Sequence, residues 1–336
     1  MTLHMNLAQN SYDIIIEHGA LRQSDKYLSL DRKILIVTDN GVPNEYAQTV
    51  AGFCKTPYIV TVPQGEGSKS FACLEKLLGV MLQNGFSRTD AVVAVGGGVV
   101  GDLAGFAASA FMRGIDFYNI PTTLLSMVDS SIGGKTAINY MGIKNCIGAF
   151  HQPKKVLIDP DVLQTLPKRQ LANGLAEAIK MAATFDAELF SYIEESNIEE
   201  NLDTIIIRSL AIKKNVVEQD EKESGLRRVL NFGHTIGHGI ESCAMGNLYH
   251  GECVALGMLP MCPPAVKERI LKVLKKSGLP TGIDFNPETV FKAVTHDKKR
   301  DGDCLRIVYV PEIGTYEVKT VGIMEFKNTI EEAFAK

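Results

Sequence analysis

The sequence predicts an α/β protein with an N-terminal parallel-sheet domain, residues 1–160, followed by a mostly α-helical C-terminal domain, residues 161–336. Two observations support this fold class. In the first part of the chain, short and almost uniformly apolar runs alternate with helical patterns, which is typical of right-handed βαβ units in an open sheet. After about residue 165, long helical patterns dominate. A chain of 336 residues is long enough for two domains with a large core.

The N-terminal domain is expected to contain five strands separated by helices. The first three are apolar almost throughout, as expected for strands that are covered on both faces of a sheet. Helical spacing lies between strands over 43–54 and 70–83, and residues 3–7 with 12–17 are compatible with a small antiparallel extension. The five strands are expected over residues 33–38, 58–63, 91–95, 117–120 and 156–159.

The C-terminal domain is expected to contain one hairpin, 305–310 with 315–320, joined across Gly314. The prolines of segment 258–264 must break or cap helices, because proline lacks an N–H and clashes with the preceding helical turn. Helices are expected over residues 170–183, 187–195, 201–219, 228–244 and 265–276.

Composition and charge exclude several classes of protein. Apolar residues make up 45% of the chain, and a formal net charge of −4 without a basic tail argues against nucleic acid as an obligate partner. The seven cysteines form no C-x-x-C pair, which indicates reduced thiols rather than disulfides or a thiolate zinc site. Residues 1–16 lack a signal-peptide pattern, and no apolar run approaches the ~20 residues of a membrane helix. A cytoplasmic protein without a membrane or nucleic-acid partner is expected.

Residues 96–102, Gly-Gly-Gly-Val-Val-Gly-Asp, follow an expected strand and open an expected helix. They match the G-x-G-x-x-G of Rossmann-like domains, in which backbone N–H groups at a helix N-terminus approach a pyrophosphate. The motif follows the third strand rather than the first, and no acidic residue ends the next strand, so a plain strand-to-helix turn explains it equally well. A second glycine-rich strand end with a charged pair, residues 63–69, favours a nucleotide site.

Residues 131–136, Ser-Ile-Gly-Gly-Lys-Thr, resemble the end of a P-loop. That motif requires glycine at position 129, where this chain has Asp129, so a nucleoside-triphosphate site is rejected. Lys135 then lies with Asp129, Lys144 and Asn145 among small apolar residues, which suits a substrate pocket. The alternative is a solvated loop.

Histidines mark the most informative stretch of the chain. His234 and His238 are four residues apart, so on a helix both imidazoles share one face. His250 follows closely, and Glu177 lies among apolar neighbours three residues before Lys180. A catalytic metal usually has three protein ligands and one open position, and all three histidines and Glu177 are candidates. The alternative for Glu177 and Lys180 is a surface ion pair.

Basic residues fall in or beside each of these motifs. A solvated surface position explains any one of them, but together, in a chain of net negative charge, they predict a pocket for a small polyanion such as a phosphorylated carboxylic acid. They are Arg113, Lys135, Lys144, Lys180, Lys213, Arg227 and Lys298.

These segments closely resemble the 3-dehydroquinate synthase family, the sugar-phosphate cyclases of the shikimate pathway. The matches keep their order and spacing through most of residues 60–260, with a weaker one at 296–302. They are GGGVVGDLAGFAASAFMRG (96–114), IPTTLLSMVDSSIGGKTAIN (120–139), IGAFHQPK (147–154), GLAEAIK (174–180), DEKESGLRRVLNFGHTIGHGIE (220–241) and YHGECVALGM (249–258). The resemblance implies a dehydroquinate synthase-like architecture, which glycerol dehydrogenases share.

The resemblance implies a lyase of aromatic amino acid and chorismate biosynthesis that uses NAD and one divalent metal ion, zinc or cobalt. Members of the family convert 3-deoxy-D-arabino-heptulosonate 7-phosphate to 3-dehydroquinate and inorganic phosphate. The implied steps are transient oxidation by NAD, phosphate elimination, re-reduction and intramolecular aldol closure. A homodimer is also implied, in which Arg113 reaches the neighbouring active site.

Position by position, the resemblance implies a role for each candidate residue. The implied metal ligands are Glu177, His234 and His250, and His238 passes to the substrate. The implied catalytic residues are Lys135, Lys180, Lys213, Glu223, Asn231 and His238. The implied substrate contacts are Arg113, Asp129, Lys135, Lys144, Asn145, Lys180, Lys213, Arg227, Asn231, His238 and Lys298, with Lys299 as the alternative to the last. The implied NAD contacts are Asp39, Asn40, Gln64, Gly65, Glu66, Gly67, Ser68, Lys69, Gly97, Gly98, Val99, Val100, Gly101, Asp102, Thr122, Thr123, Lys135, Lys144, Val162, Leu163, Gln164 and Thr165.

Two departures from the family pattern and three rival functions stay open. Ile143-Lys144-Asn145 replaces the usual Gly-Lys-Asn, and the proline-rich segment 258–264 replaces a longer helical segment. Another sugar-phosphate cyclase, of the valiolone or inosose type, is the first rival. A metal-dependent polyol dehydrogenase would share the architecture but leaves the converging lysines unexplained. A non-catalytic NAD-binding regulatory protein would not need the ligands and proton-handling residues that this chain retains.

Overall fold

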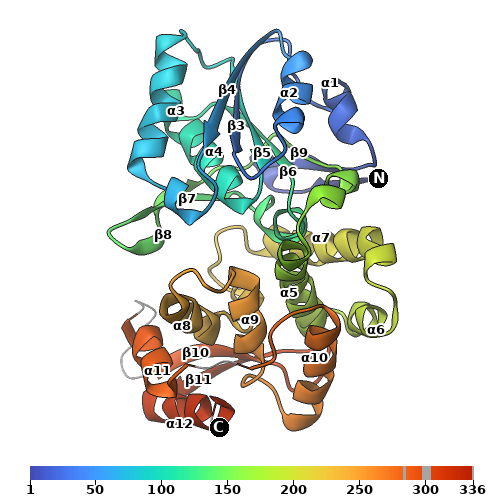
Figure 1. The fold of residues 1–336 in the computed structure, drawn as a ribbon, viewed down its shortest axis with the longest axis vertical. Coiled ribbons are helices and arrows are strands. Elements are labelled where there is room, and N and C mark those ends of the chain that lie inside the picture. The colour runs from blue at the N-terminus through green and yellow to red at the C-terminus, as the bar shows by residue number, and fades with distance from the viewer. Residues whose placement is uncertain (283–284, 297–303, 335–336) are drawn as a thin grey trace. The chain divides into compact units, whose positions relative to one another are not determined.

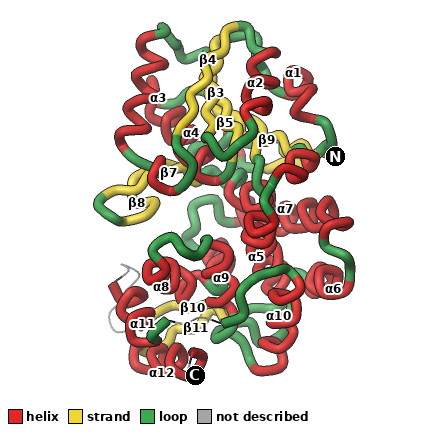
Figure 2. Tube along the Cα trace, viewed as in Figure 1, coloured by secondary structure: helices red, strands yellow, loops and turns green. Residues whose placement is uncertain are grey.

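The computed structural model describes residues 1–282, 285–296 and 304–334. The chain divides into two compact units, Met1–Leu166 and Pro167–Lys336 (Figure 1). Most strands belong to the first unit, whereas the second is dominated by helices (Figure 2). The predicted fold class is confirmed.

The boundary between the units lies beyond residue 160, where the sequence analysis divided the chain. Asp159 explains the difference, because its carboxylate accepts hydrogen bonds from the backbone N–H groups of Gly19 and Leu21 near the start of the chain. The same carboxylate caps the following 3₁₀ helix, Pro160–Thr165. The 3₁₀ helix is thereby held to the first unit.

The first unit is built on a seven-stranded sheet in the order β1-β2-β9-β6-β5-β3-β4. All neighbouring strands are parallel except β1 and β2. The expected N-terminal extension is part of this sheet, because β2 pairs with β1 on one side and with β9 on the other. The strands are β1 Thr2–Met5, β2 Tyr12–Ile16, β3 Lys33–Asp39, β4 Thr56–Val62, β5 Ala91–Gly96, β6 Asp116–Pro121 and β9 Lys155–Ile158.

Helices cover both faces of the sheet, as the uniform hydrophobicity of the strands predicted. These helices are α1 Ser24–Tyr27, α2 Asn44–Gly52, α3 Phe71–Gln83 and α4 Gly98–Ala110. Leu35 and Val37 of β3 share a core cluster with residues of α3 and α4. Successive strand residues point to opposite faces, so the fully buried Ile34 and Ile36 face the other side of the sheet, and α2 also contacts β3.

The strand order places a topological switch point between β3 and β5. From β3 the chain adds β4 on one side and then β5 on the other side. Ligands of open α/β sheets bind at the carboxyl ends of the strands at such a point. Asp39 ends β3 and Gly96 ends β5, its parallel neighbour. The glycine motif therefore lies where a nucleotide site is expected, although it follows the third strand in sequence.

A second, two-stranded sheet of this unit was not predicted. β7 Lys135–Tyr140 pairs antiparallel with β8 Ile143–Phe150, and both loop residues have positive φ, as in a type I′ hairpin turn. The expected pocket or solvated loop around Lys135 and Lys144 is thus a hairpin. Because β8 is exposed along most of its length, it lacks the apolar alternation that identifies a half-buried strand.

The second unit is mostly helical, as predicted, and contains the expected hairpin as β10 Cys304–Tyr309 and β11 Glu317–Gly322. Its helices are α5 Lys168–Phe185, α6 Ala187–Glu195, α7 Leu202–Gln219, α8 His234–Ala244, α9 His250–Met258, α10 Pro264–Lys276, α11 Pro287–His296 and α12 Ile323–Phe334. The prolines of segment 258–264 separate α9 from α10, as expected. Among the described residues, no helix is both long and apolar enough to cross a lipid bilayer.

The predicted helix over residues 228–244 is wrong in its first part. Leu226–Asn231 form a 3₁₀ helix, and α8 begins only at His234. Gly233 has a φ of 77°, a left-handed conformation that interrupts the α-helix and that glycine adopts without strain. The interruption places His234 in the first turn of α8.

Candidate metal centre and nucleotide site

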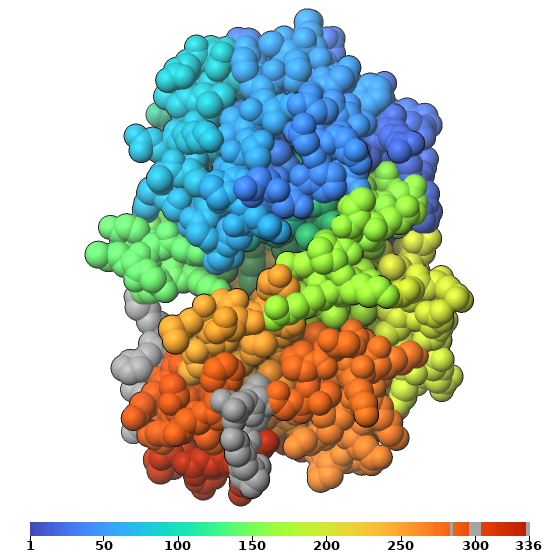
Figure 3. Space-filling model, in the orientation of Figure 1, coloured from blue at the N-terminus to red at the C-terminus, as the bar shows by residue number. Residues whose placement is uncertain are grey.

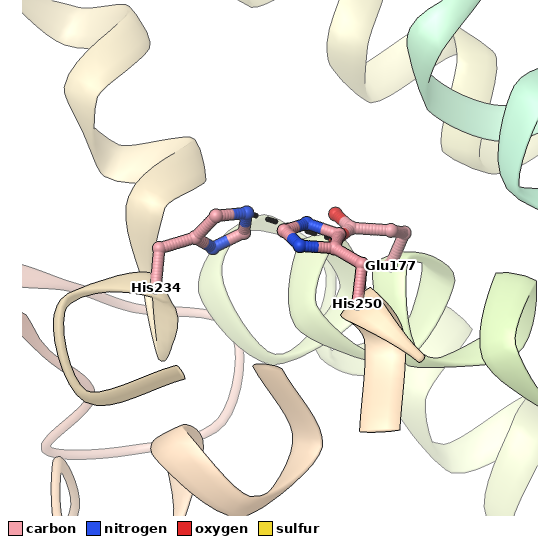
Figure 4. A group of neighbouring side chains, drawn as sticks. All are labelled: Glu177, His234 and His250. Carbon is pink, nitrogen blue, oxygen red and sulfur yellow. Dashed lines mark ion pairs between the residues drawn. The ribbon is translucent and has the colours of Figure 1, made fainter. Parts of the chain in front are cut away.

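Helices α5, α8 and α9 bring Glu177, His234 and His250 together (Figure 4). Glu177 Oε1 lies 3.7 Å from Nε2 of His234 and 3.5 Å from Nε2 of His250. One ligand atom from each residue falls within 4.8 Å of the others, a spacing that suits a single cation between them.

Glycines allow these helices to approach one another closely. A Cβ atom on Gly251 of α9 would lie 2.0 Å from the carbonyl oxygen of Asn173 in α5. A Cβ atom on Gly257 of α9 would lie 2.0 Å from the carbonyl oxygen of Gly233, just before α8. Backbone packs on backbone at both crossings, and the ligand side chains meet for this reason.

The Glu177 carboxylate is fully buried, and its two oxygens differ in their contacts. Oε2 accepts a hydrogen bond from Nζ of Lys180, which is itself 1% exposed. Oε1 is buried and accepts a hydrogen bond from no described residue. A buried oxygen without a partner is rare and costly, and a cation between Oε1 and the histidines would satisfy it. The donor set therefore fits a divalent metal. The alternative of a surface ion pair is excluded, because Glu177 and Lys180 are both buried.

Electrostatics prepare two of these groups to bind a cation. Burial alone would raise the pKa of Glu177, but the neighbouring positive charge, foremost that of Lys180, outweighs burial and holds that pKa well below the usual 4.5. Burial, together with the charge of Lys180, lowers the pKa of His234 well below 6.5 and keeps its imidazole neutral. Nδ1–H of His234 donates to the Phe232 carbonyl at 3.2 Å, which leaves the Nε2 lone pair for a metal.

Glu241 is a residue of this site to which the sequence analysis gave no role. Its Oε2 lies 3.3 Å from Nδ1 of His250, so it orients the ring whose Nε2 faces Glu177. Burial would lower the pKa of His250, yet the neighbouring carboxylates of Glu177 and Glu241 raise it to about 10. Spacing offered a signal, since His234, His238 and Glu241 recur at i, i+4 and i+7 on one face of α8.

His238 lies beside this cluster, with its ring centroid 5.4 Å from that of His234 and 5.9 Å from that of His250. It belongs to a second donor set with Glu241 and His250, whose members are only partly buried. In that set, Nδ1 of His250 and Oε2 of Glu241 already contact each other at 3.3 Å. The Glu177 set is the better candidate, because it contains the buried oxygen that lacks a partner.

The segment before α8 contains further predicted site residues. Asn231 Nδ2 donates to Glu223 Oε1 at 2.8 Å, and the side chain of Arg227 is buried. Asp220 holds the segment by accepting hydrogen bonds from the backbone N–H groups of Ser224, Gly225 and Arg227. Burial would raise the pKa of Asp220, but these hydrogen bonds lower it to about 2. Lys213 is buried on α7, whereas Lys298 lies outside the described residues.

A candidate nucleotide site lies at the carboxyl edge of the sheet in the first unit. Gly97 is the N-cap residue of α4, and as a glycine it has no side chain to cap the first N–H groups of that helix. A Cβ atom on Gly98 would lie 2.8 Å from Ser130 Oγ, and one on Gly96 would lie 2.7 Å from Val100. Thr122, from the end of β6, donates its N–H to the carbonyl of Gly96. A glycine turn that leads to uncapped helix N–H groups fits a pyrophosphate.

Charged residues implied for NAD lie next to one another. Lys69, with a side chain 3% exposed, forms an ion pair of 2.6 Å with Asp102 and one of 3.7 Å with Glu66. Lys69 Nζ also donates to Oδ1 of Asn145, so the hairpin meets this cluster. At the ends of β3 and β4, Asn40 Oδ1 accepts the N–H of Gln64 at 2.7 Å.

Other implied residues lie further along the same unit. Thr165 of the 3₁₀ helix Pro160–Thr165 bonds to the Tyr46 hydroxyl at 2.9 Å. Lys135 and Lys144 are exposed on the hairpin, and Asp129 lies in a short π-helix, Ser126–Ser130. Arg113 is exposed just beyond α4, with a φ of 68°.

Comparison with known proteins identifies the family of this chain. Residues 59–173 match the family model described as 3-dehydroquinate synthase N-terminal, and residues 174–300 match the one described as 3-dehydroquinate synthase C-terminal. A 3-dehydroquinate synthase from Streptococcus thermophilus is 43% identical over 99% of this chain and 100% of its own length. One from Lactococcus lactis subsp. cremoris is 42% identical over 99% of this chain and 100% of its own length.

Solved structures of related cyclases share the fold over almost the whole chain. A 2-deoxy-scyllo-inosose synthase complexed with carbaglucose-6-phosphate, NAD⁺ and Co²⁺ has a TM-score of 0.89 and 26% identity, and covers 99% of this chain and 100% of that one. A 2-epi-5-epi-valiolone synthase from Streptomyces hygroscopicus with NAD⁺ and Zn²⁺ bound has a TM-score of 0.88 and 29% identity, and covers 98% and 97%. The chain belongs to the 3-dehydroquinate synthase family.

Proposed function

We propose that the protein converts 3-deoxy-D-arabino-heptulosonate 7-phosphate to 3-dehydroquinate and inorganic phosphate. The observation that carries this proposal is the 43% identity to the Streptococcus thermophilus synthase over 99% of this chain and all of that protein. The matched region includes both units, and therefore the parts of the chain that carry the candidate metal centre and the candidate nucleotide site.

Glu177, His234 and His250 would hold one zinc or cobalt ion through a carboxylate oxygen and two imidazole nitrogens, which are donors that both metals accept. The chemistry supplied at this site by a bound metal would be polarisation of substrate oxygens, and that supplied by NAD would be reversible hydride transfer. Lys180 keeps Oε2 of Glu177 engaged, so Oε1 faces the histidines. Burial of this group excludes water from the carboxylate.

The glycine turn and the N-terminus of α4 would hold the pyrophosphate of NAD through backbone N–H groups. Asp39, at the end of β3, would accept hydrogen bonds from hydroxyls of the dinucleotide. Lys69 and Asp102 neutralise each other beside the glycine turn at residues 96–98, so the net charge that faces the cofactor stays small.

The substrate is an anion with a phosphate and a carboxylate, and the chain offers several cations for it. Lys213 and Arg227 are buried, and Lys135 and Lys144 are exposed on the hairpin. An imidazole nitrogen of His238 would receive the proton of a substrate hydroxyl and return it, since this ring lies next to the metal ligands. Glu223 orients Asn231 as a hydrogen-bonding group.

A homodimer is part of the proposal, with Arg113 contributed to the neighbouring active site. In support, Arg113 and its neighbour Met112 are both exposed and both have positive φ, a conformation that directs the chain abruptly away from α4. Sedimentation measurements test the assembly. Mixing Arg113→Ala with a metal-ligand variant tests the shared site, because a shared site would restore activity in mixed dimers.

Turnover decides between this function and its rivals. We expect that the protein, supplied with NAD and Zn²⁺ or Co²⁺, releases phosphate from the heptulosonate phosphate and forms dehydroquinate in equal amounts. Activity on a non-acidic sugar phosphate instead would assign a valiolone- or inosose-type cyclase, and activity on an uncharged polyol would assign a dehydrogenase. Absence of any turnover with all three substrates would leave only a binding function.

A further inference from the structure

We propose that Asn139 is a positioning residue that fastens the β7–β8 hairpin to the segment Glu66–Lys69 and thereby sets the affinity for the dinucleotide. The inference rests on the proposed function only in treating Glu66 and Lys69 as part of the NAD site. Neither the glycine motif nor the histidine cluster gives Asn139 a role.

The ladder between β7 and β8 is irregular at Asn139. The register shifts between Ile138 and Tyr140, so Asn139 has no partner residue across the hairpin. Its backbone N–H donates instead to the carbonyl oxygen of Lys69 at 2.9 Å. The irregularity thus joins the hairpin to the glycine-rich segment after β4.

The side chain of Asn139 donates hydrogen bonds to Glu66 and accepts one from Asn145. Its Nδ2 donates to Oε1 of Glu66 at 2.9 Å, and its Oδ1 accepts the backbone N–H of Asn145 at 2.8 Å. The amide donates toward the carboxylate and accepts from the N–H at the same time, which an ionised carboxylate of the same shape cannot do. Asparagine is therefore matched to both neighbours in length and in chemistry.

These contacts close a ring of four residues. Lys69 Nζ donates to Oδ1 of Asn145 and pairs with Glu66 at 3.7 Å, and Asn139 links Asn145 to Glu66. Asn145 has a φ of 53°, a strained conformation that its contacts to Asn139 and Lys69 hold in place. Lys69 also forms an ion pair with Asp102 of α4, the helix that begins at the glycine turn.

The outer half of the hairpin depends on this ring more than the inner half does, because most of β8 is exposed. Most residues of β8 are exposed, and the hairpin lies at the surface of the first unit (green in Figure 3). β7 packs on α4 through buried residues such as Ile138. Loss of the Asn139 contacts would free the outer half of the hairpin, which carries Lys144 and Asn145, without opening the core.

Asn139→Asp is the test variant, since it keeps the shape and the acceptor but turns an oxygen toward Glu66. We expect faster hydrogen exchange in the segment 135–150 and an approximately tenfold or larger rise in the dissociation constant of NAD, measured by titration without substrate. The Michaelis constant for NAD should rise more than kcat falls. Asn10→Asp, an exposed residue of the same unit, is the matched control for the added charge and should change neither quantity.

A double-mutant cycle separates positioning from general damage. Glu66→Gln keeps a hydrogen-bond acceptor for Asn139, and its amide can instead donate to Asp at position 139. In the Glu66→Gln background we therefore expect Asn139→Asp to leave exchange in 135–150 and NAD affinity nearly unchanged. A purely structural effect of Asn139→Asp would persist in that background.

Unchanged exchange or unchanged NAD affinity in Asn139→Asp overturns the inference, as does failure of Glu66→Gln to suppress the effect. Wild-type protein that binds NAD but turns over no substrate would contradict the proposed function alone. Wild-type protein that binds no NAD contradicts both, because the ring would then have no ligand to position.

Discussion

The candidate nucleotide site of the first unit and the candidate metal centre of the second differ in the groups that form them. The nucleotide site is formed by backbone at a sheet edge: a glycine turn, an uncapped helix N-terminus and strand ends. The metal centre is formed by side chains from α5, α8 and α9, with a buried carboxylate at its middle. Backbone sites tolerate solvent, whereas a buried charge depends on every neighbour.

The two sites should therefore differ in their sensitivity to single substitutions. In the first unit, loss of one side chain removes one of many weak contacts with an extended ligand. In the second unit, Glu177, Lys180 and the histidines balance one another's charge, so removing any one leaves the others uncompensated. Substitutions in the metal centre should therefore affect binding, stability and turnover together.

The largest expected effect is that of Glu177→Gln. The variant should lose its metal and its turnover. Its free energy of unfolding should fall by about 3–5 kcal/mol, because Lys180 stays buried without a carboxylate partner. Metal analysis and urea denaturation measure both effects. Glu268→Gln, whose side chain is 73% exposed, is the control. Full metal content in Glu177→Gln would remove Glu177 from the ligand set.

His238→Ala should separate the two roles of the histidines. We expect it to keep its metal but to lose about 10²–10⁴-fold in kcat, the usual contribution of a proton-transfer group. His234→Ala should lose both. Metal content and phosphate release are measured in parallel, with the exposed His18→Ala as the control. Loss of metal in His238→Ala would favour the donor set with Glu241.

Glu241→Gln should weaken metal binding by about 10- to 100-fold, since it removes the carboxylate that orients His250. Competition with a chelator measures the affinity. The metal-saturated variant should recover most of its turnover, because Glu241 is not a ligand of the Glu177 set. An unchanged affinity would show that His250 is held by the helix packing alone.

Gly98→Ala should affect only the nucleotide site. Its Cβ would lie 2.8 Å from Ser130 Oγ, a side-chain atom that can shift, so the fold should survive. The methyl group would keep the pyrophosphate from the backbone and weaken NAD by about tenfold. Titration with NAD and metal analysis test this pair of outcomes. Gly52→Ala, which has no atom within 4 Å of the added Cβ, should leave NAD affinity unchanged.

The smallest effect concerns pH. The pKa of Asp220 is about 2 in the folded protein, below its ordinary 3.8, so its contribution to stability is present above pH 3.8 and is lost as the pH falls toward 2. The difference in stability between wild type and Asp220→Asn should therefore be constant above about pH 5 and shrink below it. Urea denaturation across this range measures the difference. Asp31→Asn, with a side chain 90% exposed, should show no such trend.

Elements with a local sequence signal could be predicted from the sequence, and elements without such a signal could not. The strands β3 and β5, the helix α4 and the glycine turn follow from local hydrophobicity and spacing. The hairpin of β7 and β8 was missed because exposed strands carry no apolar alternation. The break before α8 was missed because Gly233 is also tolerated within helices at modest cost.

The sequence by itself determined the fold class, the family resemblance and the candidate donors, because strand periodicity, motif order and residue chemistry are local properties of the chain. Spacing alone left four candidate ligands open. Only the tertiary structure decided that Oε1 of Glu177 is buried beside His234 and His250 without a hydrogen-bond partner. It also showed that Lys180 hydrogen-bonds to the other carboxylate oxygen and that Glu241 orients His250. The physical reason is that burial and charge balance arise where α5, α8 and α9 cross at glycines, and helix spacing along the chain cannot specify that crossing.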